Sequence, residues 1–207
     1  VNVVIWILKQ SNIYYEEQII STYETLTELA NVQLYKSNQR TVQQDGWRYC
    51  DEKYANLGPY GLDYRIILER TGGYDGRDRY GSRCPLASRA TALINDLVTI
   101  AYNLGFDTVG KVLAHDKHWV PGKQNYFFFM DSKTDKREVL FEAKAFKKGT
   151  LHLRLNEQFI QKLNVVHGRL KGWLRSAEDA VAEMDIPFDV AQESFNITLK
   201  ISAQNVP

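Results

Sequence analysis

The chain has 207 residues, of which 44% are hydrophobic and 25% are charged. This composition excludes a disordered or fibrous protein, and the length suffices for a domain with its own hydrophobic core. The formal net charge of +1 excludes a bulk polycation, so any surface for nucleic acid has to be a local patch.

The cysteines and the first residues of the chain indicate the cellular compartment of the protein. Cys50 and Cys84 are far apart and neither belongs to a CxxC motif, which predicts a reduced, cytoplasmic protein. The apolar run VNVVIWIL at residues 1–8 is too short to span a bilayer, and no basic segment precedes it. We therefore expect neither a signal peptide nor a membrane partner.

Residues 1–85 are predicted to form an N-terminal region of helical and irregular structure. Residues 1–8 fit either a strand or the first turns of a helix. A helix over 13–35 is indicated by apolar residues at helical spacing, namely Ile19, Tyr23, Leu26, Ala30 and Leu34. A polar stretch with turn signals follows, then a short strand at 64–68 and a glycine-rich loop at 71–85.

Residues 86–207 are predicted to form an α+β domain. A helix over 86–104 and an irregular connection lead into three strands that form a meander at about 124–155. Asn156 and Ser176 are suited to begin two further helices, with a break of the first at Asn164. A C-terminal strand is expected at about 197–203. The fold class is therefore α+β, with an antiparallel or mixed sheet packed with helices.

The hydrophobic alternation fixes the register of one hairpin of this meander. If Lys147, Lys148 and Gly149 form a three-residue loop, Gly149 takes the left-handed position. Apolar residues then pair on the core side: Phe141 with Leu155, Ala143 with Leu153, and Ala145 with Leu151. On the other side Lys144 faces His152 and Glu142 faces Arg154. A two-residue loop would mix the two faces, so the pattern rejects it.

The same hairpin contains Glu142-Ala143-Lys144, the Glu-x-Lys core of a metal-dependent nuclease motif. In such a site Glu142 and a second acid would hold Mg²⁺, and Lys144 would orient the attacking water. Asp131 lies roughly 17 Å from Glu142 along the strands, whereas Asp96 or Asp116 could supply the second acid. The competing interpretation is a cross-strand charge pair with Arg154. No cofactor is expected unless this alternative holds.

Charge is distributed unevenly in the last third of the chain. Residues 137–175 hold nine Lys or Arg and three acids, whereas residues 176–196 hold six acids and no base. We expect the basic segment to form a surface for phosphates. Its candidate residues are Lys144, His152, Arg154, His167, Arg169, Lys171 and Arg175. In the alternative interpretations, the acidic segment folds back and neutralises this surface, or both segments are solvated faces.

Three smaller features complete the candidates. The loop GGYDGRDRYGSR at 72–83 could bind a single strand through Arg77, Arg79 and Arg83, or be a solvated loop. Gly168 and Gly172 would leave one helix face bare for another backbone or a ligand. His115 and His118 could offer two metal ligands, but no His or Cys close in sequence completes a set, so we expect no metal site.

The runs LINDLVTIAYNLGF (93–106) and EVLFEAKAFKKGTLHLRLNEQFIQKLNVVHGRLKGWL (138–174) carry a resemblance. They resemble a family known only as a domain of unknown function. It occurs in proteins of phages, plasmids and integrative elements, sometimes beside adenine-specific DNA methyltransferase domains. The resemblance implies no catalytic residues. The Asp/Asn-Pro-Pro-Tyr/Phe motif of those methyltransferases is absent from this sequence.

Three functions fit these observations. We expect a non-enzymatic nucleic-acid-binding or accessory protein of a mobile element. The first alternative is the metal-dependent nuclease centred on Glu142 and Lys144. The second is a protein-interaction module, in which the acidic helix and Trp173 contact a partner such as a DNA methyltransferase.

Overall fold

The computed structural model describes residues 2–30, 61–76 and 85–197. The helices of these ranges are α1 (Asn2–Leu29), α3 (Ser88–Asn103), α4 (Glu157–Leu170), α5 (Ala177–Met184) and α6 (Phe188–Phe195). The strands are β1 (Arg65–Leu68), β2 (Asn125–Asp131), β3 (Lys136–Ala145) and β4 (Leu151–Leu155). Two 3-10 turns, Val109–Lys111 and Ala114–Asp116, lie in the irregular connection between α3 and β2.

The four strands form one antiparallel sheet in the order β1-β4-β3-β2. The predicted α+β class, the meander and the short strand at 64–68 are therefore confirmed. The meander supplies three neighbouring strands, and β1 extends the sheet on the far side of β4. The predicted C-terminal strand lies, from residue 198 on, outside the described residues.

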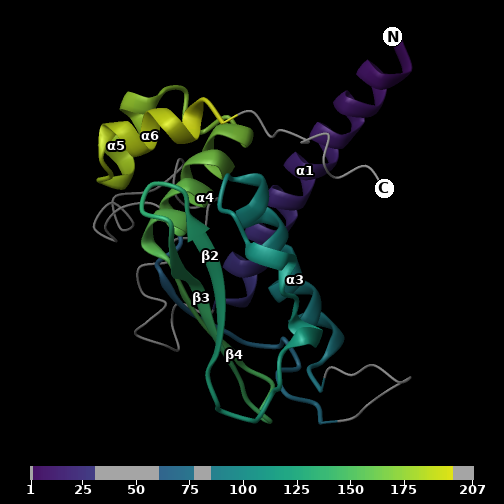
Figure 1. Cartoon of the computed structure of the whole chain (residues 1–207). Coiled ribbons are helices and arrows are strands. Elements are labelled where there is room, and N and C mark those ends of the chain that lie inside the picture. Colours follow the sequence, from purple (N-terminus) through teal and green to yellow (C-terminus); the bar gives the residue numbers. More distant parts are fainter. Residues whose placement is uncertain (1, 31–60, 77–84, 198–207) are drawn as a thin grey trace.

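Helices cover one face of the sheet. In Figure 1, α1, α3 and α4 gather on one side of the strands, and α5 and α6 lie beside α4 at one end of the sheet. One hydrophobic cluster joins these layers, and it includes Tyr23 of α1, Leu97 of α3, Leu153 of β4 and Leu163 of α4. Residues on both sides of residue 86 contribute to this cluster.

The β3–β4 hairpin has the predicted register. Phe141, Ala143 and Ala145 pair with Leu155, Leu153 and Leu151, and these six residues are buried. Gly149 has a φ of 93°, which a residue with a side chain rarely adopts. The Gly149 N–H donates to the Phe146 carbonyl, and the Phe146 N–H donates to the Thr150 carbonyl, so the three-residue loop is closed.

The helices differ from the prediction at three places. Helix α1 ends at Leu29, before the predicted end at residue 35, whereas residues 2–8 form its first turns, which is one of the two structures predicted for them. Helix α4 begins after Asn156 as predicted, but it runs through Asn164 without a break. Helix α6 was not predicted, because eight residues after Pro187 are too short to display a helical period.

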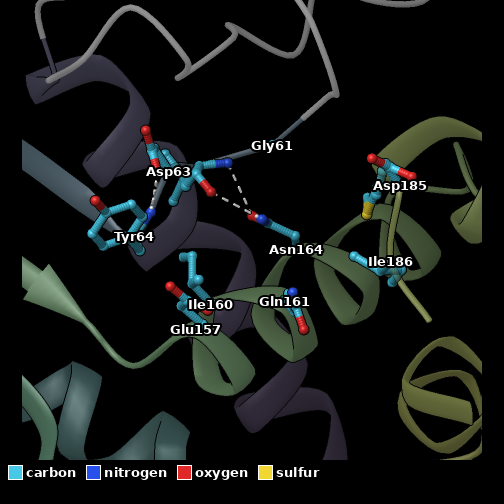
Figure 2. Close-up of a pocket in the computed structure, with 11 residues that line it drawn as sticks. Gly61, Asp63, Tyr64, Glu157, Ile160, Gln161, Asn164, Asp185 and Ile186 are labelled. Atoms are coloured by element: carbon cyan, nitrogen blue, oxygen red, sulfur yellow. Dashed lines mark hydrogen bonds between the residues drawn. The ribbon is translucent and has the colours of Figure 1, made fainter. Parts of the chain in front are cut away.

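Asn164 does not break α4 because its side chain bonds outside the helix. Its Oδ1 accepts from the Tyr23 hydroxyl at 2.9 Å and from the Leu62 N–H at 3.0 Å. Its Nδ2 donates to the Leu62 carbonyl at 3.0 Å (Figure 2). Gly61 has a φ of 129°, and a Cβ there would lie 2.7 Å from Asn164 Nδ2. One amide thus joins α4, α1 and the segment before β1.

We predict that Asn164→Ala lowers the free energy of unfolding by about 2–4 kcal/mol, because it leaves the buried Leu62 N–H and carbonyl without their partner. Tyr23→Phe removes one of the three hydrogen bonds and should cost only about 0.5–1.5 kcal/mol. Urea denaturation of both variants measures the difference. Equal losses would show that the bonds to Leu62 contribute nothing.

Candidate functional site

The face of the sheet opposite the helices carries mostly polar and aromatic side chains. We call it the open sheet face and define it by Arg65, Ile67, Tyr126, Phe128, Glu142, Lys144, His152 and Arg154. Three of these residues are cations and one is an anion. All eight are exposed or half-buried, whereas their neighbours Ile66, Phe127, Ala143 and Leu153 are buried in the core.

Strand pairing arranges these side chains in two rows. Arg65 pairs with Arg154, Arg154 with Glu142, and Glu142 with Tyr126, so one row crosses all four strands. The next row holds Ile67, His152 and Lys144, which pair in that order. At a strand spacing of about 4.8 Å, a row of four residues spans about 14 Å.

A depression of about 300 Å³ lies between the rows, lined by residues of β1, β3 and β4 and by Gln124. Glu142 is the carboxylate in it. The Gln124 amide donates to Glu142 Oε2, and Arg154 Nη1 lies 3.9 Å from Glu142 Oε1. The predicted cross-strand charge pair is therefore confirmed. The Arg154 side chain is 63% exposed, so the pair adds little stability and leaves the guanidinium accessible to a ligand.

His152 is surrounded by positive charge. Burial lowers its pKa, and Lys148, Lys144 and Arg65 lower that pKa further. The imidazole is therefore mostly neutral at pH 7, and it adds a polar group to the surface but no full charge. Its Nε2 atom is buried and makes no hydrogen bond to any described residue. The ring packs against Phe146 with a centroid distance of 4.5 Å.

The acids considered for a nuclease site are engaged elsewhere. Asp131 pairs with Lys136 at the far end of β3 and accepts hydrogen bonds from Lys133 N and Thr134 Oγ1. Asp96 on α3 accepts from Gln18 Nε2 on α1, and Asp116 accepts from Leu113 N. Among the described residues, no group of three or more His, Cys, Asp and Glu could hold a metal ion, His115 and His118 included.

The prediction that His167 belongs to the phosphate surface is wrong, because its side chain is fully buried. Its ring stacks on Tyr23 at 3.8 Å with an interplanar angle of 8°, and Trp173 packs edge-on at 5.4 Å. The charged neighbours Arg169 and Lys171 suggested an exposed position. However, His167 follows Ile160 by seven residues and Leu163 by four, a spacing that places all three on one helix face.

Two of the other predicted cations of this surface, Arg169 and Lys171, contact groups of the same chain. Arg169 is half-buried and donates to the carbonyls of Phe195 and Ile197. Lys171 Nζ lies 2.9 Å from Glu24 Oε1 of α1. Arg175 is exposed. Sequence reasoning thus placed together residues that the fold separates, and only Lys144, His152 and Arg154 of the predicted set belong to the open sheet face.

The acidic segment folds back on α4, as one of the alternative interpretations expected, but its ion pair there involves Lys162, which does not belong to the predicted surface. Helix α6 packs on α4 and α5 packs on α6, and Lys162 Nζ lies 2.7 Å from Glu193 Oε1. A second hydrophobic cluster joins them, with Val165, Leu174, Met184 and Ala191 among its residues.

The glycines of α4 do not form a bare face. A Cβ at Gly168 would lie 2.7 Å from Leu174 Cδ1, so Leu174 of the same chain already occupies that space. Gly172 follows the end of α4 with a φ of 72° and reverses the chain. The close approach predicted from the spacing of Gly168 and Gly172 is therefore made by Leu174 of the same chain.

The glycine-rich loop is described only at its two ends. Thr71 Oγ1 donates to the Gly149 carbonyl, and Tyr74 N donates to the Phe146 carbonyl. The N–H groups of Asp75 and Gly76 both approach the Pro85 carbonyl at 3.0 Å. The loop therefore starts and ends beside the β3–β4 turn. Arg77, Arg79 and Arg83 lie outside the described residues, and their predicted role stays a prediction.

A second depression, of about 270 Å³, lies between α4, residues 61–64 and residues 184–186 (Figure 2). Its charged residues are Asp63, Glu157 and Asp185, which come from three separate segments. This acidic lining repels anions such as phosphate.

No protein family, curated protein or solved structure matches this chain in the comparisons. None of the described helices combines the length and the apolar composition that crossing a bilayer requires.

Burial, and to a lesser extent Lys171, lower the pKa of His167 to about 3. In the unfolded chain this histidine takes up a proton below about pH 6.5, so the folded protein loses stability as the pH falls from 6.5 towards 3. We predict that the free energy of unfolding falls by about 2 kcal/mol more between pH 7 and pH 5 in the wild type than in His167→Phe.

Urea denaturation at the two pH values measures this difference. His118→Gln is the control, because His118 is exposed. Its pH dependence should match that of the wild type. Parallel pH profiles for the wild type and His167→Phe would contradict the assignment of a buried neutral imidazole.

Proposed function

We propose that this protein binds nucleic acid through the open sheet face and has no catalytic role of its own. The observation that carries the proposal is the convergence of Arg65, Lys144 and Arg154 on a face that the described helices leave exposed. Glu142 is the one acid among the residues that define this face, and it lies between Arg154 and Gln124.

Local charge matters here because the chain as a whole is nearly neutral. Cations that contact phosphates displace condensed counterions, and this release supplies most of the sequence-independent affinity for nucleic acid. Arginine is well suited to phosphate because its guanidinium donates two parallel hydrogen bonds. Arg65 and Arg154 are adjacent across the β1–β4 pair and both are exposed, which supports a contact with successive phosphates.

The expectation of a role in a mobile element rests on the sequence alone, on the runs at residues 93–106 and 138–174 that resemble proteins of phages, plasmids and integrative elements. We propose that the protein acts there as a nucleic-acid-binding accessory protein. No arrangement of the described residues favours the nuclease or the methyltransferase partner over this role.

The salt dependence of DNA binding tests the proposal. We predict that a labelled 20-base-pair duplex binds with an affinity that falls linearly in a plot of log K against log salt. Lys144→Gln combined with Arg154→Gln should reduce the magnitude of this slope by about 1–2, because each lost phosphate contact removes roughly 0.9 from it. Fluorescence anisotropy at salt concentrations from 50 to 200 mM, roughly the range in which the effect is large, measures both slopes.

The matched control is Lys171→Gln combined with Arg175→Gln, which removes one lysine and one arginine from the connection between α4 and α5. This pair should leave the slope unchanged. Equal slopes for the wild type and the Lys144, Arg154 variant would contradict the proposal. Cleavage of the DNA on addition of Mg²⁺, lost in Glu142→Gln, would replace the proposal by the nuclease alternative.

A further inference from the structure

The open sheet face has an aromatic side as well as a cationic side. The row that begins with Arg65 on β1 ends with Tyr126 on β2, at the opposite border of the sheet. Tyr126 is 40% exposed. Phe128 follows two residues later on the same face, and its ring lies 6.3 Å from that of Tyr126 with an interplanar angle of 26°.

Two further cations border these rings. The Arg137 guanidinium carbon lies 3.9 Å from the centre of the Phe128 ring, and Lys117 Nζ lies 5.8 Å from it. Both distances are within the range of cation–π contacts. The β2 side of the face therefore offers nearly parallel rings with positive charge beside them.

This combination discriminates between two forms of nucleic acid. In a duplex the bases are stacked on one another and their faces are hidden, so a protein surface meets mainly phosphates and groove edges. In a single strand the bases can turn out and stack on aromatic side chains, while cations hold the backbone. An accessible aromatic ring beside cations on a sheet therefore favours the second form.

The position of Glu142 indicates how a bound strand would be oriented on the open sheet face. Its carboxylate lies between the arginines of β1 and β4 and the rings of β2. Because a carboxylate repels phosphate, the backbone of a bound strand is expected over Arg65 and Arg154. The bases then extend past Glu142 towards Tyr126 and Phe128.

We propose that the ligand of the open sheet face is single-stranded nucleic acid, with its phosphates on Arg65 and Arg154 and at least one base stacked on Tyr126. This inference rests on the proposed function and narrows it. The shared chemistry is that of an unpaired polynucleotide, whether DNA or RNA.

The test compares three labelled probes by fluorescence anisotropy with the full chain: a 15-residue oligothymidylate, a 15-residue oligouridylate and a DNA duplex of the same length. The single strands should bind at least about tenfold more tightly than the duplex. Tyr126→Leu, which keeps an apolar side chain but removes the ring, should weaken single-strand binding by roughly 5- to 100-fold and leave duplex binding unchanged.

The matched control is Tyr14→Leu, which removes a 63% exposed tyrosine from α1, and it should bind all probes as the wild type does. Phe128→Leu provides a second variant at the same site and should weaken single-strand binding in the same direction. A difference between oligothymidylate and oligouridylate shows which of the two single strands the protein prefers, and either preference supports the inference.

Two results would overturn it. If the duplex binds as tightly as the single strands, or if Tyr126→Leu and Tyr14→Leu are equivalent, the stacking assignment is wrong. In that case a salt slope that depends on Lys144 and Arg154 would still support the proposed function. If no probe binds, both the inference and the proposed function fail.

Discussion

The register of the β3–β4 hairpin is the constraint on which the rest of the structure depends. A shift by one residue would turn Phe141, Ala143 and Ala145 to solvent and bury Glu142 and Lys144, because side chains alternate along a strand. The closed turn at Gly149 and the burial of six apolar residues exclude that shift. Strands β1 and β2 pair with the two strands of this hairpin. The pairing places Arg65, Arg154, Glu142 and Tyr126 in one row across the sheet.

The parts of this structure that a sequence predicts well are those with a strong local signal. The hairpin register followed from strict alternation and one glycine, and α3 lies within the range 86–104 for which a helix was predicted. Half of the candidate site followed with the hairpin, because Glu142, Lys144, His152 and Arg154 had to share a face. The nearly continuous apolar run NYFFFM conceals its alternation, so that Tyr126 and Phe128 were not recognised as part of the same face.

What the sequence could not supply is pairing between distant segments. Arg65 belongs to the site only because β1 pairs with β4, and no local pattern specifies that partner. The burial of His167 depends on Tyr23, more than 140 residues earlier in the chain. The contrast in charge between residues 137–175 and 176–196 was visible from the start. In the fold, α6 packs on α4 and α5 packs on α6, and Glu193 of α6 pairs with Lys162 of α4, so that part of the positive charge is neutralised within the chain.

The contact between Gly168 and Leu174 fixes how closely the smaller hydrophobic cluster approaches α4. Leu174 belongs to the smaller hydrophobic cluster, and it lies where any side chain at position 168 would have to go. A methyl group at position 168 would force the Leu174 side chain to move, and the change would fall on the smaller cluster that α5 and α6 form with Val165 of α4. The packing of the C-terminal helix pair is therefore matched to a glycine at this one position.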